Sequence, residues 1–184
     1  MAKNRQFLIL GLISILLMSC TMKDDIQRDI VIETDSIGFT IPILTNLEDT
    51  LTIAELQNTV DLNQQVNNNT DQFTLADLRS AQITKFVIKL DKPDTDGNDI
   101  SAFSYLRVQL KAPGKPTIQL GVNNNVSTSY AATLNINITA TPLQVQEYLS
   151  AGDLTYVITG LLRDPTTKAM QAKAVAGYKL TLGM

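Results

Sequence analysis

Residues 105–111 read YLRVQLK, and residues 133–139 read TLNINIT. In both stretches apolar and polar side chains alternate with a period of two, which is typical of a β-strand that buries one face. The side chains that share the apolar face are Leu106, Val108 and Leu110 in the first stretch and Leu134, Ile136 and Ile138 in the second. The two stretches therefore predict antiparallel strands with one face in a core and the other in water.

Five further stretches alternate in the same way and extend this prediction along the chain. They cover residues 37–43, 83–90, 117–122, 154–158 and 178–182. Clusters of Asp, Asn, Gly and Pro lie at 94–99, 112–116 and 123–125, and such residues favour turns. Because Pro42 has no amide hydrogen to donate, we expect its strand to lie at a sheet edge or to end there.

Helical patterns are fewer. Residues 141–144, TPLQ, combine a capping box with proline at the first helical position, and they predict a short helix that ends before Gly152. Thr74 is placed to start a single turn. Residues 53–60 have apolar side chains at i, i+3 and i+7, which is the spacing of a helical face.

About seven or eight strands and one short linking helix favour an all-β fold, namely an antiparallel, immunoglobulin-like β-sandwich. The chain has 184 residues, enough for one such domain, which we place at residues 29–184. A barrel is the alternative. A transmembrane barrel is disfavoured because Arg107, Lys111 and Asn135 lie on the outward faces of the strands, whereas a lipid-facing band is apolar.

The composition excludes several kinds of chemistry. The chain has no His, no Trp and one Cys, so it lacks an imidazole base, a Cys/His dyad, a His or Cys zinc site and an internal disulfide. Its 18 acidic residues leave room for a glycosidase-like acid pair, but few aromatic side chains remain for sugar stacking. We therefore expect a protein that is not an enzyme and uses no cofactor.

Residues 1–19 have the pattern of a cleaved signal peptide. Lys3 and Arg5 give a positive start, and an apolar run follows at residues 7–18. This run is shorter than the roughly 20 apolar residues that cross a bilayer as a helix. It therefore suits a targeting segment better than a permanent membrane anchor.

Residues 17–20 read LMSC and resemble the lipobox of bacterial lipoproteins. The resemblance implies cleavage after Ser19, a diacylglyceryl group on the Cys20 thiol and acylation of the freed amine. Each buried CH₂ group contributes about 0.8 kcal/mol, so two or three acyl chains make a stable membrane anchor. Residues 20–28 then form the lipidated N-terminus and its tether.

The tether contains Lys23, Asp24 and Asp25, which resemble the surface-export signal of Bacteroidota lipoproteins. The resemblance implies that the body lies on the outer face of the outer membrane, with an outer-membrane protein as a possible partner. The alternatives are charges that only keep the tether soluble and a body that faces the periplasm. The net charge of −3 becomes more negative when the basic leader is removed, which disfavours nucleic acid as a partner.

An Asp-rich stretch, DKPDTDGND at residues 91–99, provides one candidate metal site. Asp94, Asp96 and Asp99 offer the hard oxygen ligands that Ca²⁺ prefers. Their spacing is not that of an EF-hand loop, so a polar hairpin turn is the alternative interpretation.

These observations together predict a lipid-anchored, surface-exposed outer-membrane lipoprotein that acts as a noncatalytic binding or accessory subunit. The polar stretches 67–70 and 123–129 are either binding loops or solvated loops. A second hypothesis is a structural subunit of a periplasmic or surface fibre that assembles by strand addition at the edge near Pro42. A third is an acid-pair glycan hydrolase.

Overall fold

The computed structural model describes residues 26–183, which form nine β-strands, two α-helices and two 3-10 turns. The strands are β1 (Gln27–Glu33), β2 (Ile37–Ile41), β3 (Leu51–Thr59), β4 (Leu78–Leu90), β5 (Phe103–Lys111), β6 (Ile118–Asn123), β7 (Thr133–Ile138), β8 (Asp153–Leu162) and β9 (Met170–Gly183). The helices are α2 (Leu62–Asn69) and α3 (Pro142–Leu149), and the turns are η1 (Leu75–Asp77) and η2 (Ile100–Ala102).

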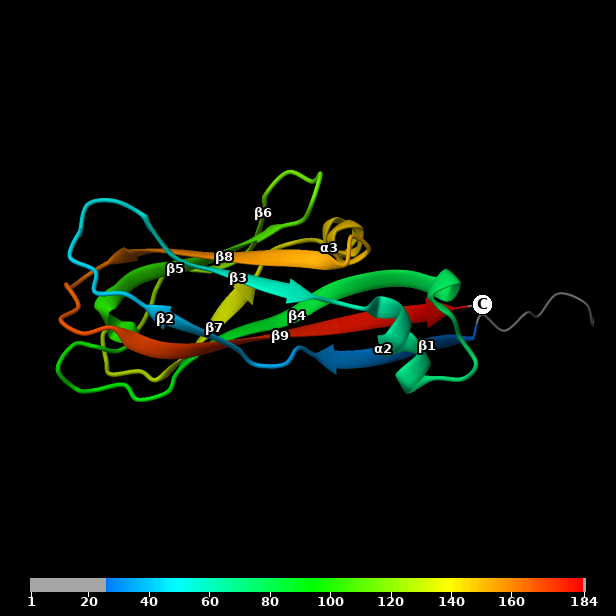
Figure 1. The fold of residues 1–184 in the computed structure, drawn as a ribbon, viewed down its shortest axis with the longest axis horizontal. Helices are drawn as coiled ribbons and strands as arrows, with labels where there is room; N and C mark the ends of the chain where they lie inside the picture. Colours follow the sequence, from blue (N-terminus) through cyan, green and yellow to red (C-terminus); the bar gives the residue numbers. More distant parts are fainter. Residues whose placement is uncertain (1–25, 184) are drawn as a thin grey trace, which may run out of the picture.

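The strands lie in two packed layers (Figure 1). One layer has the order β2-β9-β4-β7, with β1 paired along the other half of β9, and the second has the order β3-β8-β5-β6. Each of these pairings is antiparallel. From β2 onward every connection crosses between the layers except the one from β5 to β6. This is the strand order of a jelly roll, a sandwich of two four-stranded sheets.

The predicted all-β antiparallel sandwich is confirmed by this arrangement. The strand order refines the immunoglobulin-like type that the sequence suggested. Alternating side chains define which face of a strand is buried, but they do not define which strands pair.

The two layers join on one side of the sandwich and stay open on the other. β6 pairs with β7 at Gly121↔Ile138 and Val122↔Asn137. A Cβ atom on Gly121 would lie 2.5 Å from the Asn137 carbonyl oxygen, so this corner requires glycine. On the opposite side β1 and β2 face β3, and no ladder joins these described strands. We call this open edge the seam.

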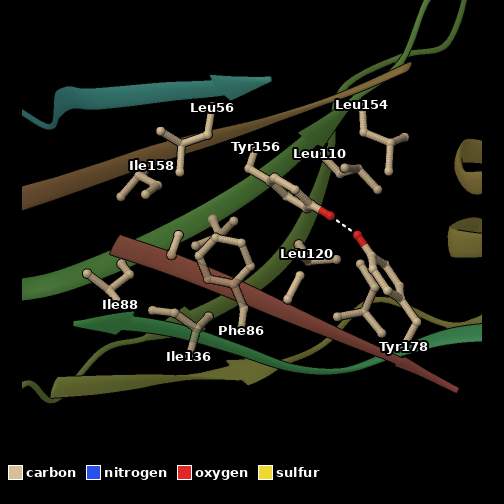
Figure 2. Close-up of a cluster of buried hydrophobic side chains, with 14 of the residues drawn as sticks. Leu56, Phe86, Ile88, Leu110, Leu120, Ile136, Leu154, Tyr156, Ile158 and Tyr178 are labelled. Carbon is tan, nitrogen blue, oxygen red and sulfur yellow. Dashed lines mark hydrogen bonds between the residues drawn. The ribbon is translucent and has the colours of Figure 1, made fainter. Parts of the chain in front are cut away.

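The core between the layers is apolar and includes Tyr156 and Tyr178 (Figure 2). Phe86 of β4 and Tyr156 of β8 pack with ring centroids 5.2 Å apart and planes tilted by 56°. β9 contributes Ala172, Ala174 and Ala176 to the buried face, and their small size leaves room for large side chains. Full burial of a side chain such as Phe86 contributes about 1.5–3 kcal/mol.

Each of the seven alternating stretches overlaps a strand, and the helix predicted after Thr141 is confirmed as α3, capping box included. The turn predicted at Thr74 is confirmed as η1. The helical interpretation of residues 53–60 is wrong, because residues 51–59 form β3. A bulge near Thr52 adds a residue to this strand, so that Ile53 and Leu56 both face the core although they are three positions apart.

The structure differs from the sequence analysis at α2 and at the start of β1, and it agrees with the sequence analysis at the end of β2. One short helix was expected, and α2 is a second one that the sequence analysis missed. β1 begins at Gln27, so the last two residues assigned to the tether pair with β9. β2 is an edge strand that ends at Ile41, directly before Pro42, as predicted.

Candidate functional site

Four loops gather at one end of the sandwich, and we call this surface the four-loop end (Figure 1). They are the β2–β3 loop (42–50), the β4–β5 loop (91–102), the β6–β7 loop (124–132) and the β8–β9 loop (163–169). β1 begins and β9 ends at the opposite end. The alternating crossovers of the jelly roll bring these loops together, although they are far apart in the sequence.

Asn98 links the β4–β5 loop to the β8–β9 loop. This residue is only 2% exposed. Its Oδ1 accepts hydrogen bonds from the backbone N–H groups of Thr167 and Lys168, each at 2.9 Å, and its Nδ2 donates to Asp94 Oδ1 at 3.2 Å. A buried amide that is paired on both sides fixes the two loops relative to each other.

Asp99 and the neighbouring backbone link the β4–β5 loop to the β6–β7 loop. The buried Asp99 carboxylate accepts from the backbone N–H of Ser101 at 2.6 Å and of Ala131 at 3.3 Å. The Ile100 N–H donates to the Ala131 carbonyl at 3.0 Å. Asp99 therefore caps η2 and holds the β6–β7 loop beside it.

Arg163 and Thr166 connect the remaining loops. The Arg163 guanidinium donates to the carbonyl oxygens of Ser101 at 2.7 Å and Val126 at 2.9 Å. The buried Thr166 exchanges hydrogen bonds with Leu44, donating its backbone N–H at 2.9 Å and accepting the Leu44 N–H on Oγ1 at 2.8 Å. Polar side chains thus brace all four loops against one another.

The braced loops present apolar and acidic side chains to solvent. Ile43 is 56% exposed, Leu47 is 43% exposed and Tyr130 is 53% exposed. The exposed acidic residues of these loops, which outnumber the exposed basic residues Lys92 and Lys168, are Glu48, Asp49, Asp91, Asp96 and Asp164. Loops held by a rigid scaffold are where binding residues concentrate, and their order in the free protein lowers the entropy cost of binding.

The three candidate calcium ligands lie in the β4–β5 loop, but their carboxylates do not converge on a common site. Asp94 forms an ion pair with Lys168 at 3.1 Å, and this pair raises the pKa of Lys168. The same ion pair, together with the hydrogen bond from Asn98, lowers the pKa of Asp94. Asp99 caps η2 as described, and Asp96 is exposed. Over residues 26–183 no group of three or more His, Cys, Asp or Glu side chains is placed to hold a metal ion.

The lipid-attachment residue Cys20 and the export-like residues Lys23, Asp24 and Asp25 lie outside the described residues. Within residues 26–183 no helix is both long and apolar enough to cross a bilayer. Of the two polar stretches, 67–70 is at the end of α2, and 123–129 lies at the four-loop end.

The bracing residues Asn98, Arg163 and Thr166 were not identified from the sequence. Their partners lie up to about 120 positions away, as for the Leu44–Thr166 pair. No local pattern in one sequence signals such a contact.

No protein-family model and no curated protein matches this chain. Solved structures similar to it include the VP2 subviral particle of infectious bursal disease virus, with 11% identity and a TM-score of 0.37 over 85% of this chain and 32% of that chain. The Gt strain of the same virus has 11% identity and a TM-score of 0.36, over 85% and 33% of the two chains. Desmodium yellow mottle tymovirus has 13% identity and a TM-score of 0.23, over 85% and 90%. The chain thus spans about one third of the length of the infectious bursal disease virus chains, 33% for the Gt strain.

Proposed function

We propose that the protein is a lipid-anchored outer-membrane lipoprotein that lies on the cell surface and uses its four-loop end as a noncatalytic binding surface for a protein partner. The observation that carries the proposal is the position of the N-terminal strand. β1 begins at the end of the sandwich opposite the four loops, so an anchor that precedes β1 leaves those loops pointing away from the bilayer (Figure 1).

Distances along the chain support this geometry. From Cys20 to Gln27 a fully extended tether reaches about 25 Å. The 14-residue strand β9 runs along the sandwich and is about 45 Å long at about 3.3 Å per residue. The four-loop end would therefore stand several nanometres from the bilayer, where a large partner has access to it.

The chemistry of the four-loop end defines the partner it suits. Its exposed acidic side chains favour a partner with a basic surface, and Ile43, Leu47 and Tyr130 supply apolar contacts to that partner. Opposite charge mainly raises the association rate, so we expect binding to weaken as the salt concentration rises.

Both open edges of the sandwich disfavour the fibre hypothesis. β1 and β2 are separated by a break at residues 34–36, and β3 contains the bulge near Thr52. β1 also carries Asp29 and Glu33, which form ion pairs with Lys179 and Lys85. Breaks, bulges and charges on edge strands hinder the addition of another strand.

The anchor is tested by metabolic labelling with palmitate. We expect labelling to be lost in Cys20→Ala and kept in the neighbouring control Thr21→Ala. Labelling that persists in Cys20→Ala would refute the lipid attachment.

Display and binding are tested with introduced thiols, because Cys20 is the only cysteine in the chain. Asn124→Cys places an exposed thiol at the four-loop end, and Asn68→Cys is the matched control on α2 at the other end. On intact cells we expect a membrane-impermeant maleimide to label Asn124→Cys, and a cross-linker to capture one protein partner from position 124 but not from 68. An unlabelled Asn124→Cys in intact cells that is labelled after lysis contradicts surface display. Equal capture from both positions contradicts the assignment of the binding surface.

A further inference from the structure

We propose that the seam contains a second binding site, for a small neutral ligand rich in hydroxyl groups such as one sugar ring. The seam pocket has a volume of about 250 Å³. Its lining residues include Thr34 and Asp35 between β1 and β2, Asn58 and Thr59 of β3, Gln64 of α2 and Tyr178 of β9. The inference concerns the folded body alone and does not depend on the lipid anchor or on the four-loop end.

The pocket exists because the edge strand is interrupted. β1 pairs with β9 at residues 177–183, β2 pairs with it at residues 170–174, and residues 34–36 leave the ladder between them. Thr34 fixes the break, because its N–H donates to the Ala176 carbonyl at 2.8 Å and its Oγ1 accepts the Ala176 N–H at 3.0 Å. The opening is therefore a defined part of the fold.

Three polar side chains occupy core-facing positions beside this opening. Asn58 follows the buried Leu56 by two residues, so the β3 alternation points it toward the core. The hydroxyl groups of Tyr156 and Tyr178 hydrogen-bond to each other between the two layers (Figure 2). Polar groups at such positions lower stability unless they are fully paired.

The Asn58 amide lies close to the Tyr156 hydroxyl, but no hydrogen bond of ordinary geometry reaches its Nδ2. Among residues 26–183 three buried side-chain nitrogen or oxygen atoms lack a hydrogen-bond partner, and one of them, Asn58 Nδ2, belongs to a residue that lines the seam pocket. Leaving a buried donor unpaired is unfavourable, whereas a leucine at this position would continue the apolar core. An unpaired donor beside a pocket is the arrangement expected if a ligand oxygen accepts its hydrogen.

The lining selects the chemical class of the ligand. It contains no Lys or Arg, and it includes the carboxylates of Glu33, Asp35 and Asp61, so an anion is disfavoured. Glu33 already pairs with Lys85, and Asp61 caps α2 by accepting the Gln64 N–H at 2.9 Å. The remaining amide and hydroxyl groups both donate and accept, which matches the hydroxyl groups of a sugar.

The volume limits the size of the ligand. A cavity of about 250 Å³ has room for about eight water molecules at about 30 Å³ each, and it is smaller than the roughly 300–1,000 Å³ of pockets for drug-sized ligands. A single ring fits this volume, either free or at the end of a glycan, because the pocket is open to solvent.

The test is titration calorimetry of the purified full chain with a panel of neutral monosaccharides, and with ethanolamine and inorganic phosphate as competing classes. We expect at least one monosaccharide to bind saturably. Asn58→Leu should weaken this binding at least tenfold, and Gln64→Ala, at the exposed rim, should weaken it several-fold. Gln57→Leu is the matched control, because Gln57 is next to Asn58 but faces away from the seam pocket, and it should bind like the wild type.

Thermal unfolding of the same variants separates a ligand role from a structural one. If Asn58 is kept for a ligand, Asn58→Leu should unfold at the same temperature as the wild type or higher. The inference is overturned if Asn58→Leu unfolds several degrees lower, if no monosaccharide binds, if only ethanolamine or phosphate binds, or if binding is unchanged in both Asn58→Leu and Gln64→Ala.

Discussion

The hydrogen bond between Tyr156 and Tyr178 makes a prediction about coupled mutations. The two residues come from β8 and β9, in different layers, and both are almost fully buried (Figure 2). Tyr156→Phe removes one hydroxyl and leaves the other buried without its partner, and Tyr178→Phe does the same in reverse. An unpaired buried hydroxyl costs about 1–3 kcal/mol, so each single variant should lose about 2 kcal/mol of unfolding free energy.

The double variant should lose much less than the sum of the two. When both hydroxyls are replaced, no buried polar group is left unpaired at this contact, and such replacements can be nearly neutral. We therefore expect a coupling free energy of about 1–3 kcal/mol in the double-mutant cycle. The exposed Tyr130→Phe is the control and should change stability by less than about 0.5 kcal/mol.

Urea denaturation followed by far-ultraviolet circular dichroism measures these values, since the chain contains no Trp for fluorescence. With an m-value of about 2 kcal/mol/M, a single variant should shift the midpoint by about 1 M. Additive losses within about 0.5 kcal/mol would show that each hydroxyl has its own partner. That result would refute our description of the core at the seam.

Three further predictions test other parts of the fold. Asn98→Ala leaves two backbone N–H groups of the β8–β9 loop unpaired, so its melting temperature should fall by about 5–15 °C, against little change in the exposed control Asn124→Ala, by calorimetry. Gly160→Ala places a Cβ 2.9 Å from a β5 carbonyl oxygen, so it should destabilise more than Gly38→Ala, where nothing lies within 4 Å, in urea denaturation. Burial raises the pKa of Tyr156 in the folded protein. Above pH 10 the Tyr156 hydroxyl therefore loses its proton more readily in the unfolded chain, and the unfolding free energy should fall by up to about 1.4 kcal/mol per pH unit. Urea denaturation over a pH series should show a shallower fall of the unfolding free energy with pH in Tyr156→Phe.

The strands were predicted best where they pair with their neighbours without a bulge, because the apolar side chains then keep a period of two. β7 keeps strict alternation and was identified with its buried face. β3 was misassigned because the bulge near Thr52 moves the apolar side chains out of a period of two and into a spacing that also suits a helix. α2 was missed because LNQQVNNN has only two apolar residues and several Asn, a poor helix former. This helix is stabilised by its Asp61 cap and by burial of Leu62 and Val66.

The candidate sites were less accessible to sequence analysis than the fold. The Asp-rich stretch 91–99 was recognised as unusual, but its role in bracing depends on the Asn98 contacts with a loop about 70 residues later. The seam pocket depends on the break at residues 34–36, and neither the break nor the pairing of β1 with β9 is visible in local periodicity. Contacts of this range follow from strand order, which a single sequence does not define.

The two candidate sites use buried polar side chains in opposite ways, and stability measurements can tell them apart. At the four-loop end Asn98 is paired with backbone and side-chain groups, so its network stabilises the fold and fixes the loops. At the seam Asn58 Nδ2 is buried without a hydrogen-bond partner, which is unfavourable in the absence of a ligand. Removing the first amide should therefore lower the unfolding temperature, whereas replacing the second with leucine should not. If both changes lower it equally, Asn58 belongs to the scaffold, and the binding surface must be sought at the four-loop end alone.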